Sequence, residues 1–259
     1  MTPARAGALL ALTLVLAGIA GSASARLPWK GYLGAAGPDT AAMLPPPPSS
    51  GSPEAEADRA VFRATRALKG TLRWDMAVND VAQTRIVANL SCAVGVDLQT
   101  KELPALRHLL LTMAADVSRA VSGPKRLYRR SRPYLVDPGL ICTDRTPLLA
   151  RSPDYPSGHS TWGWSVGLVM AELVPDRSTA ILARSRAFGE SRMVCGVHNA
   201  SSVAAGRTNA EILVAVLHSA PAFHSDMESA RLELAGLRRT GRPAIGCDAE
   251  AAAMATPLR

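Results

Sequence analysis

Apolar residues recur at intervals of three and four along most of this chain, and this spacing limits its fold more than any other feature. Over residues 103–121, one helix face would carry Leu106, Leu109, Leu110, Met113, Ala114 and Val117. Aromatic residues make up 4% of the chain and alanine is frequent, which suits closely packed helices. Few segments alternate polar with β-branched residues. We therefore predict an all-α fold, a single-domain helical bundle.

The same spacing predicts helices over residues 54–70, 75–94, 103–121, 159–174, 176–189, 203–220 and 222–238. Ser122-Gly123-Pro124 should end the third of these helices, and a proline-rich loop should cover 133–156. Residues 26–53 contain the run Pro45 to Pro48, which predicts a stiff extended segment. Residues 241–259 are expected to form a loose tail. The helical domain therefore covers residues 54–240.

Residues 1–25 have the pattern of a secretory signal peptide. Arg5 precedes an apolar run from Gly7 to Gly18, and Ala23-Ser24-Ala25 is a typical cleavage site. The run is shorter than the roughly twenty residues that span a bilayer, so a membrane anchor is the less favoured alternative. We predict a mature protein that is exported to the periplasm or secreted and does not contact a membrane.

The cysteine count is even, which suits an exported chain. Two disulfides with three connectivities can form among Cys92, Cys142, Cys195 and Cys247. A bridge between Cys142 and Cys195 would join two loops that carry charged motifs, and we state it as a hypothesis. The cysteines lack the close spacing of zinc ligands, so we predict no metal site.

The formal net charge of +8 points to an anionic partner. The densest basic cluster lies between Lys125 and Arg132. The charge is not gathered into a tail or a stripe with aromatic residues between the cations, so we predict no nucleic-acid binding. We expect the basic field to attract a small anionic substrate, and we expect the arginines between those two residues to form a solvated helix face.

Three short segments carry the candidate chemistry. Lys125 and Arg132 are seven residues apart, so they would share a helix face and clamp one phosphate, with Pro133 ending the helix at Arg132. Next along the chain, Ser157 and Gly158 begin a predicted helix, whose backbone N–H groups form a natural anion site beside His159. Arg192 ends a further helix. Gly196 permits a turn, and His198 begins the next helix.

In order and spacing, these segments resemble the signature of the class A non-specific acid phosphatases, a branch of the type 2 phosphatidic acid phosphatase and vanadium haloperoxidase superfamily. They read Lys125-(six residues)-Arg132-Pro133, Pro156-Ser157-Gly158-His159 and Ser191-Arg192-(five residues)-His198. The resemblance implies an all-α bundle, export, and hydrolysis of phosphomonoesters to inorganic phosphate without a metal or cofactor.

The resemblance also implies a role for each site residue. His198 would be the nucleophile that forms a phosphohistidine, and His159 the acid that protonates the leaving oxygen. Ser157 and Gly158 would contact the phosphate. Its charge would be neutralised by Lys125, Arg132 and Arg192.

One position departs from the family pattern, because Ser202 stands where the family has aspartate, one helical turn after His198. A carboxylate there would accept the Nδ1 proton of the imidazole, whereas serine offers a weaker, uncharged acceptor. Another group could take its place, the enzyme could be slow, or the site could only bind phosphate. The alternatives are thus a degenerate phosphate-binding protein and a vanadium-dependent haloperoxidase with His198 as the vanadate ligand. A homo-oligomer and the physiological substrate are left open.

Overall fold

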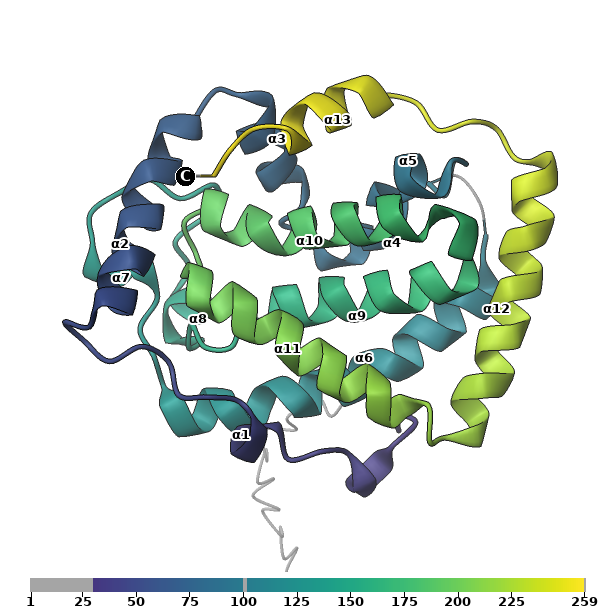
Figure 1. The fold of residues 1–259 in the computed structure, drawn as a ribbon, viewed down its shortest axis with the longest axis horizontal. Coiled ribbons are helices and arrows are strands. Elements are labelled where there is room, and N and C mark those ends of the chain that lie inside the picture. Colours follow the sequence, from purple (N-terminus) through teal and green to yellow (C-terminus); the bar gives the residue numbers. More distant parts are fainter. Residues whose placement is uncertain (1–29, 100–101, 259) are drawn as a thin grey trace, which may run out of the picture.

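The computed structural model describes residues 30–99 and 102–258, and the predicted signal peptide lies outside these ranges. Every regular element in the described part is helical, which confirms the all-α prediction (Figure 1). The helices are α1 (Thr40–Met43), α2 (Pro53–Thr65), α3 (Leu72–Asn79), α4 (Ile86–Asn89), α5 (Ser91–Val94), α6 (Pro104–Tyr128), α7 (Pro133–Val136), α8 (Pro147–Arg151), α9 (Gly158–Leu173), α10 (Ser178–Val194), α11 (Ala200–Leu217), α12 (Pro221–Thr240) and α13 (Cys247–Met254).

Helix α9 forms the centre of the bundle, between α10 and α11, with α6 beside it (Figure 1). Small residues let α10 approach closely. A Cβ atom added to Gly163 would lie 2.4 Å from the Phe188 ring, and one added to Gly167 would lie 2.4 Å from Ser185. Both distances are far below van der Waals contact, so glycine is required at each position. Helix α9 is apolar and buried on most sides.

Helix α6 continues past the expected break, because Pro124 lies inside it rather than after its end. A proline cannot donate to the carbonyl four residues earlier, which is that of Ala120. Two side chains donate to this carbonyl instead: Thr40 Oγ1 at 2.6 Å and Asn209 Nδ2 at 3.2 Å. Tertiary hydrogen bonds thus replace the one that the proline removes, and the helix extends to Tyr128.

We predicted one helix over residues 75–94, and this prediction is wrong. The chain makes α3, a short 3₁₀ turn, α4 and α5 over this stretch. At the end of α5, Gly95 has a left-handed backbone with φ of 85°. Residues 30–52 follow the expectation more closely, since Pro45 to Pro48 are extended and only the short turns η1 (Gly34–Ala36) and α1 are helical.

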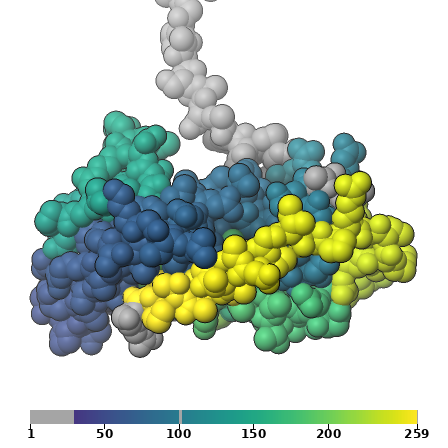
Figure 2. All heavy atoms as spheres, turned by 90° about the horizontal axis from the view of Figure 1, so that it is seen from above, coloured from purple at the N-terminus to yellow at the C-terminus, as the bar shows by residue number. Residues whose placement is uncertain are grey.

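Residues 241–258 differ from the loose tail that we expected over 241–259. Helix α13 forms there, and the C-terminal segment crosses the surface of the earlier helices as a continuous band (Figure 2). It is attached by a disulfide between Cys92 and Cys247 and by an ion pair of 2.8 Å between Glu250 and the buried Arg184. The covalent link explains why this segment packs against the domain, because it closes a long loop that an alanine-rich helix alone would leave mobile.

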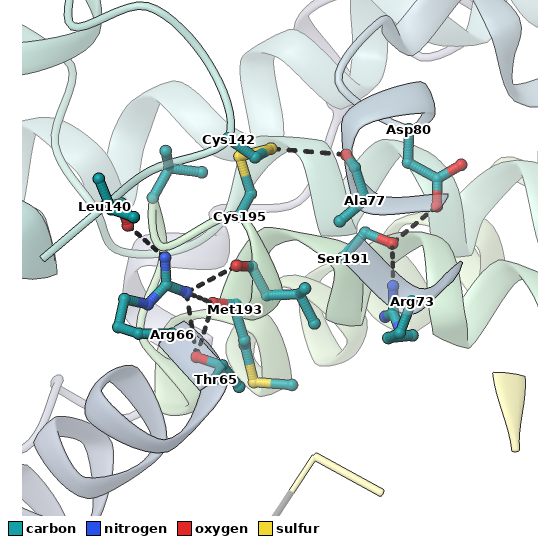
Figure 3. The surroundings of a disulfide bond; sticks show 12 residues. Thr65, Arg66, Arg73, Ala77, Asp80, Leu140, Cys142, Ser191, Met193 and Cys195 are labelled. Atoms are coloured by element: carbon teal, nitrogen blue, oxygen red, sulfur yellow. Dashed lines mark hydrogen bonds between the residues drawn. A yellow bond between two sulfur atoms is a disulfide. The ribbon is translucent and has the colours of Figure 1, made fainter. Parts of the chain in front are cut away.

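The second disulfide joins Cys142 to Cys195, as hypothesised, and lies beside the third motif (Figure 3). Next to it, Arg66 donates to the carbonyls of Leu140, Met193 and Val194. Together they tie the end of α10 to the segment after α7. Both constraints hold the short connection between α10 and α11 in place.

Four helix termini meet at one end of the bundle, on the left in Figure 1. Helices α9 and α11 begin there, and α6 and α10 end there. Every predicted site residue lies at or next to one of these termini. No helix in the described ranges is both long and apolar enough to cross a membrane.

Candidate active site

His198 is buried in the turn between α10 and α11, where Gly196 has a φ of 78°. Its Nδ1 atom lies 2.8 Å from Oδ1 of Asp154, a fully buried carboxylate in the loop before α9. Its Nε2 atom lies 3.2 Å from Nη1 of Arg132. The two ring nitrogens therefore face a carboxylate on one side and a guanidinium on the other.

These two partners assign the tautomer of His198. A guanidinium has only donors, so Nε2 must be the unprotonated nitrogen that accepts from Arg132. Nδ1 then carries the hydrogen and donates it to Asp154. The carboxylate therefore orients the ring so that the lone pair of Nε2 faces the cationic residues.

Ser202 does not take the role expected from its position. Its hydroxyl donates to Oδ2 of Asp154 at 2.5 Å and has no hydrogen bond to the imidazole. Asp154 also accepts from the backbone N–H of Asn199 at 3.2 Å and from the Asn199 side-chain amide at 2.9 Å. Of the three outcomes that Ser202 left open, the geometry supports the first, in which another carboxylate takes the place of the family aspartate.

Sequence reasoning missed Asp154. Its only sequence signal is that it immediately precedes Tyr155-Pro156 and the second motif. Nothing in that spacing pairs it with a histidine 44 residues later.

Arg130 was expected to lie on a solvated helix face, and this expectation is wrong. It pairs with Asp58 at 2.8 Å and lies 3.6 Å from Asp154, where it adds positive charge behind the carboxylate.

Lys125 and Arg132 do not share a helix face. Lys125 lies in the last turn of α6, whereas Arg132 is the extended residue before α7. Arg129, in the left-handed region at φ 45°, ends α6 between them and reverses the chain. The loop before α9 holds both cations, because Lys125 Nζ donates to the Pro153 carbonyl and Arg132 Nε donates to that of Ser152 at 2.8 Å.

His159 and Arg192 present polar atoms that have no partner in the described part of the chain. These buried atoms are Nε2 of His159 and both Nε and Nη1 of Arg192. The His159 ring stacks on Phe188 with centroids 4.4 Å apart. Buried donors are rarely left unpaired in proteins, so these atoms are suited to an anionic ligand.

Helix α9 begins at Gly158, one residue before the predicted start, and Ser157 is its N-cap. The Ser157 hydroxyl accepts from the backbone N–H of Ser160 at 3.2 Å, which caps the helix. A Cβ atom on Gly158 would lie 3.2 Å from Val121 and 4.0 Å from Cε of Lys125. The glycine therefore lets the start of α9 pack against α6, which brings the second motif beside the first.

Comparison with known proteins places this arrangement in a family. Residues 105–225 match the model of the PAP2 superfamily. The chain is 41% identical to an acid phosphatase of Zymomonas mobilis over 203 residues, which cover 76% of this chain and 75% of that protein. It is 35% identical to a non-specific acid phosphatase of Providencia stuartii, over 78% of this chain and 83% of that protein. The chain belongs to the PAP2 superfamily and groups with its bacterial acid phosphatases.

Burial and mutual repulsion govern the ionisation of this PAP2 site. Burial and the charge of Arg132 lower the pKa of His198 to about 3, although Asp154 acts in the opposite direction. Burial, Arg192 and His198 hold the pKa of His159 well below its ordinary value. Burial and Arg132 also lower the pKa of Lys125 to about 8. These influences link all six residues and show that they share one electrostatic environment.

Proposed function

We propose that this chain is an exported acid phosphatase that hydrolyses phosphomonoesters of broad structure through a phosphohistidine on His198. The observation that carries the proposal is the imidazole of His198, with Nδ1 on Asp154 and Nε2 facing Arg132. This is the arrangement of an activated nitrogen nucleophile beside a site for negative charge. The names of the relatives, acid phosphatase and non-specific acid phosphatase, support the same activity.

In the first step, Nε2 of His198 attacks phosphorus, the N–P bond forms and the P–O bond to the leaving group breaks. His159 gives its Nε2 proton to the leaving oxygen. The equatorial phosphoryl oxygens accept hydrogen bonds from Lys125, Arg132 and Arg192, which neutralise the charge of the transition state. Ser157 and the N–H groups at the start of α9 contribute further donors.

In the second step, water attacks phosphorus and the N–P bond breaks. The neutral His159 takes a proton from the water, and inorganic phosphate leaves with the ring of His198 back in its starting tautomer. Asp154 stays ionised throughout. Burial raises its pKa, but the hydrogen bond and charge of His198, the hydroxyl of Ser202 and Arg130 together lower the pKa below its ordinary value. The carboxylate can therefore stabilise the positive charge that His198 acquires.

Activity should be highest below neutral pH. His198 must be neutral to attack, and its pKa of about 3 leaves it neutral across the acidic range. His159 must be protonated, and the negative charge of a bound phosphomonoester raises its pKa, which is low in the free protein. Activity should therefore decline as the pH rises and His159 loses its proton, and further above about pH 8, where Lys125 loses its charge.

Hydrolysis of p-nitrophenyl phosphate by the mature protein, measured from pH 4 to pH 8 with EDTA present, tests this proposal. We expect EDTA-resistant activity that falls towards pH 8. A folded protein that binds phosphate without hydrolysis would instead be the degenerate phosphate-binding protein. Halide oxidation that requires vanadate and peroxide would identify the haloperoxidase alternative.

A further inference from the structure

A strongly basic hollow of about 340 Å³ lies on the outer side of the phosphate clamp. Its size is within the range of small-molecule sites. We call it the basic hollow, and it is lined by Lys125, Arg126, Arg129, Arg130, Ser131, Leu135, Ala150, Arg151 and Pro153. Five of these nine residues are cations and none is acidic. The proposed hydrolysis of a simple monoester does not use most of them.

Three of the four arginines that line the hollow lack a counter-charge. Arg130 is paired with Asp58, but Arg126, Arg129 and Arg151 form no ion pair with any residue in the described part of the chain. The C-terminal ends of α6 and α8 bring these arginines together. The negative end of each helix dipole lowers the electrostatic cost of placing the cations close to one another. Their mutual repulsion would be relieved by a bound anion.

The basic hollow and the catalytic centre share a wall. Lys125 lines the hollow and also belongs to the proposed phosphate clamp, and its Nζ atom is bonded to the Pro153 carbonyl. The residue after Pro153 is Asp154, which holds His198. Arg130 links the two regions, because it lines the hollow and lies 3.6 Å from Asp154. An anion in the hollow is therefore a neighbour of the phosphate that His198 attacks.

We propose that the basic hollow binds a second phosphate group, carried by the leaving group of the substrate. The preferred substrates are then small molecules with two phosphate esters, a preference that rests on the proposed phosphatase activity. A nucleic-acid strand fits the hollow poorly, because no aromatic residue lines it to stack a base. Arg126, Arg129 and Arg151 are exposed, so the attraction should weaken as the salt concentration rises.

The test compares kcat/KM for glucose 1,6-bisphosphate with kcat/KM for glucose 6-phosphate. We expect the ratio to exceed about 10 in the unmodified protein, since several charge-assisted contacts add to one phosphate. The double variant Arg126→Gln/Arg151→Gln should lower the ratio about tenfold. An exposed control pair, Arg63→Gln/Arg239→Gln, removes the same net charge elsewhere and should keep the ratio.

A ratio that is the same in the Arg126→Gln/Arg151→Gln variant and the unmodified protein would overturn the proposal. So would an equal drop in the control pair, because the effect would then come from the overall field. A third outcome is that inorganic phosphate alters hydrolysis of p-nitrophenyl phosphate non-competitively, and only when the two arginines are present. The hollow would then bind a free anion rather than the second phosphate of a substrate, and the proposal would be wrong.

Failure of the proposed phosphatase activity can be recognised separately, since the protein would then hydrolyse neither sugar phosphate. The hollow would still be tested by calorimetric titration with glucose 1,6-bisphosphate. Tighter binding than that of glucose 6-phosphate, lost in Arg126→Gln/Arg151→Gln, would support a two-phosphate site. Equal binding of the two sugars would reject it.

Discussion

Replacing His198 by alanine should lower kcat for p-nitrophenyl phosphate by a factor on the order of 10⁴ or more. The side chain supplies the Nε2 lone pair that faces Arg132, and this nitrogen is the proposed nucleophile. The cations themselves stay in place, because Arg132 keeps its bonds of 2.8 Å to the carbonyls of Ser152 and Val197. Phosphate should therefore still bind to the variant, as measured by calorimetry.

The matched control is His224→Ala, the same substitution at an exposed position on α12. It should retain the activity of the unmodified protein. Acid quenching during turnover should trap a phosphorylated protein. The His198→Ala variant, treated in the same way, should carry no phosphoryl group. Activity above about one hundredth of normal in that variant would contradict the assignment of the nucleophile.

Asp154→Asn should lower kcat by a factor on the order of 10² to 10⁴. The carboxylate is the acceptor for Nδ1 of His198, so an amide of the same shape removes the charge and permits the wrong tautomer. The affinity for inorganic phosphate should change little, since Asp154 does not face the ligand. Two measurements separate a positioning role from a general loss of structure. The first compares the change in kcat with the change in the inhibition constant of phosphate. The second is the ¹⁵N chemical shifts of the His198 ring.

Position 202 provides a sharper test, because the same substitution should have opposite effects in two backgrounds. Ser202→Asp alone should lower turnover, since the hydroxyl lies 2.5 Å from Oδ2 of Asp154 and a second carboxylate there would repel the first. In the Asp154→Asn background, Ser202→Asp should raise kcat about tenfold, because it restores a carboxylate one turn after His198.

Steady-state kinetics of the unmodified protein, the two single variants and the double variant would measure this coupling. A gain in turnover from Ser202→Asp alone would mean that Asp154 does not serve His198. It would support the simpler view, suggested by the sequence, that Ser202 impairs the protein. Additive losses in the double variant would also contradict the exchange of roles between the two positions.

The helical class could be predicted from local patterns in the sequence, and most of the site from short motifs that resemble a known family signature. The apolar spacing of α6 indicates in the sequence which of its faces is buried. Likewise, Ser157 and Gly158 mark the start of α9 by capping preference and by the need for close approach. Lys125, Arg132, His159, Arg192 and His198 were identified by the resemblance of three short segments to the acid phosphatase signature, and they share one electrostatic environment in the structure.

The sequence could not predict features that depend on partners distant along the chain. Helix α6 continues through Pro124 because Thr40 and Asn209 satisfy the freed carbonyl, and α13 is held by a disulfide to residue 92. Tertiary structure decided the role of Asp154 in the same way. A carboxylate orients an imidazole from any direction that reaches Nδ1, so the group need not follow His198 by one helical turn. The sequence alone determined the long central helices and the charged groups, and the tertiary structure decided which carboxylate serves the nucleophile, because that choice depends on distance in space.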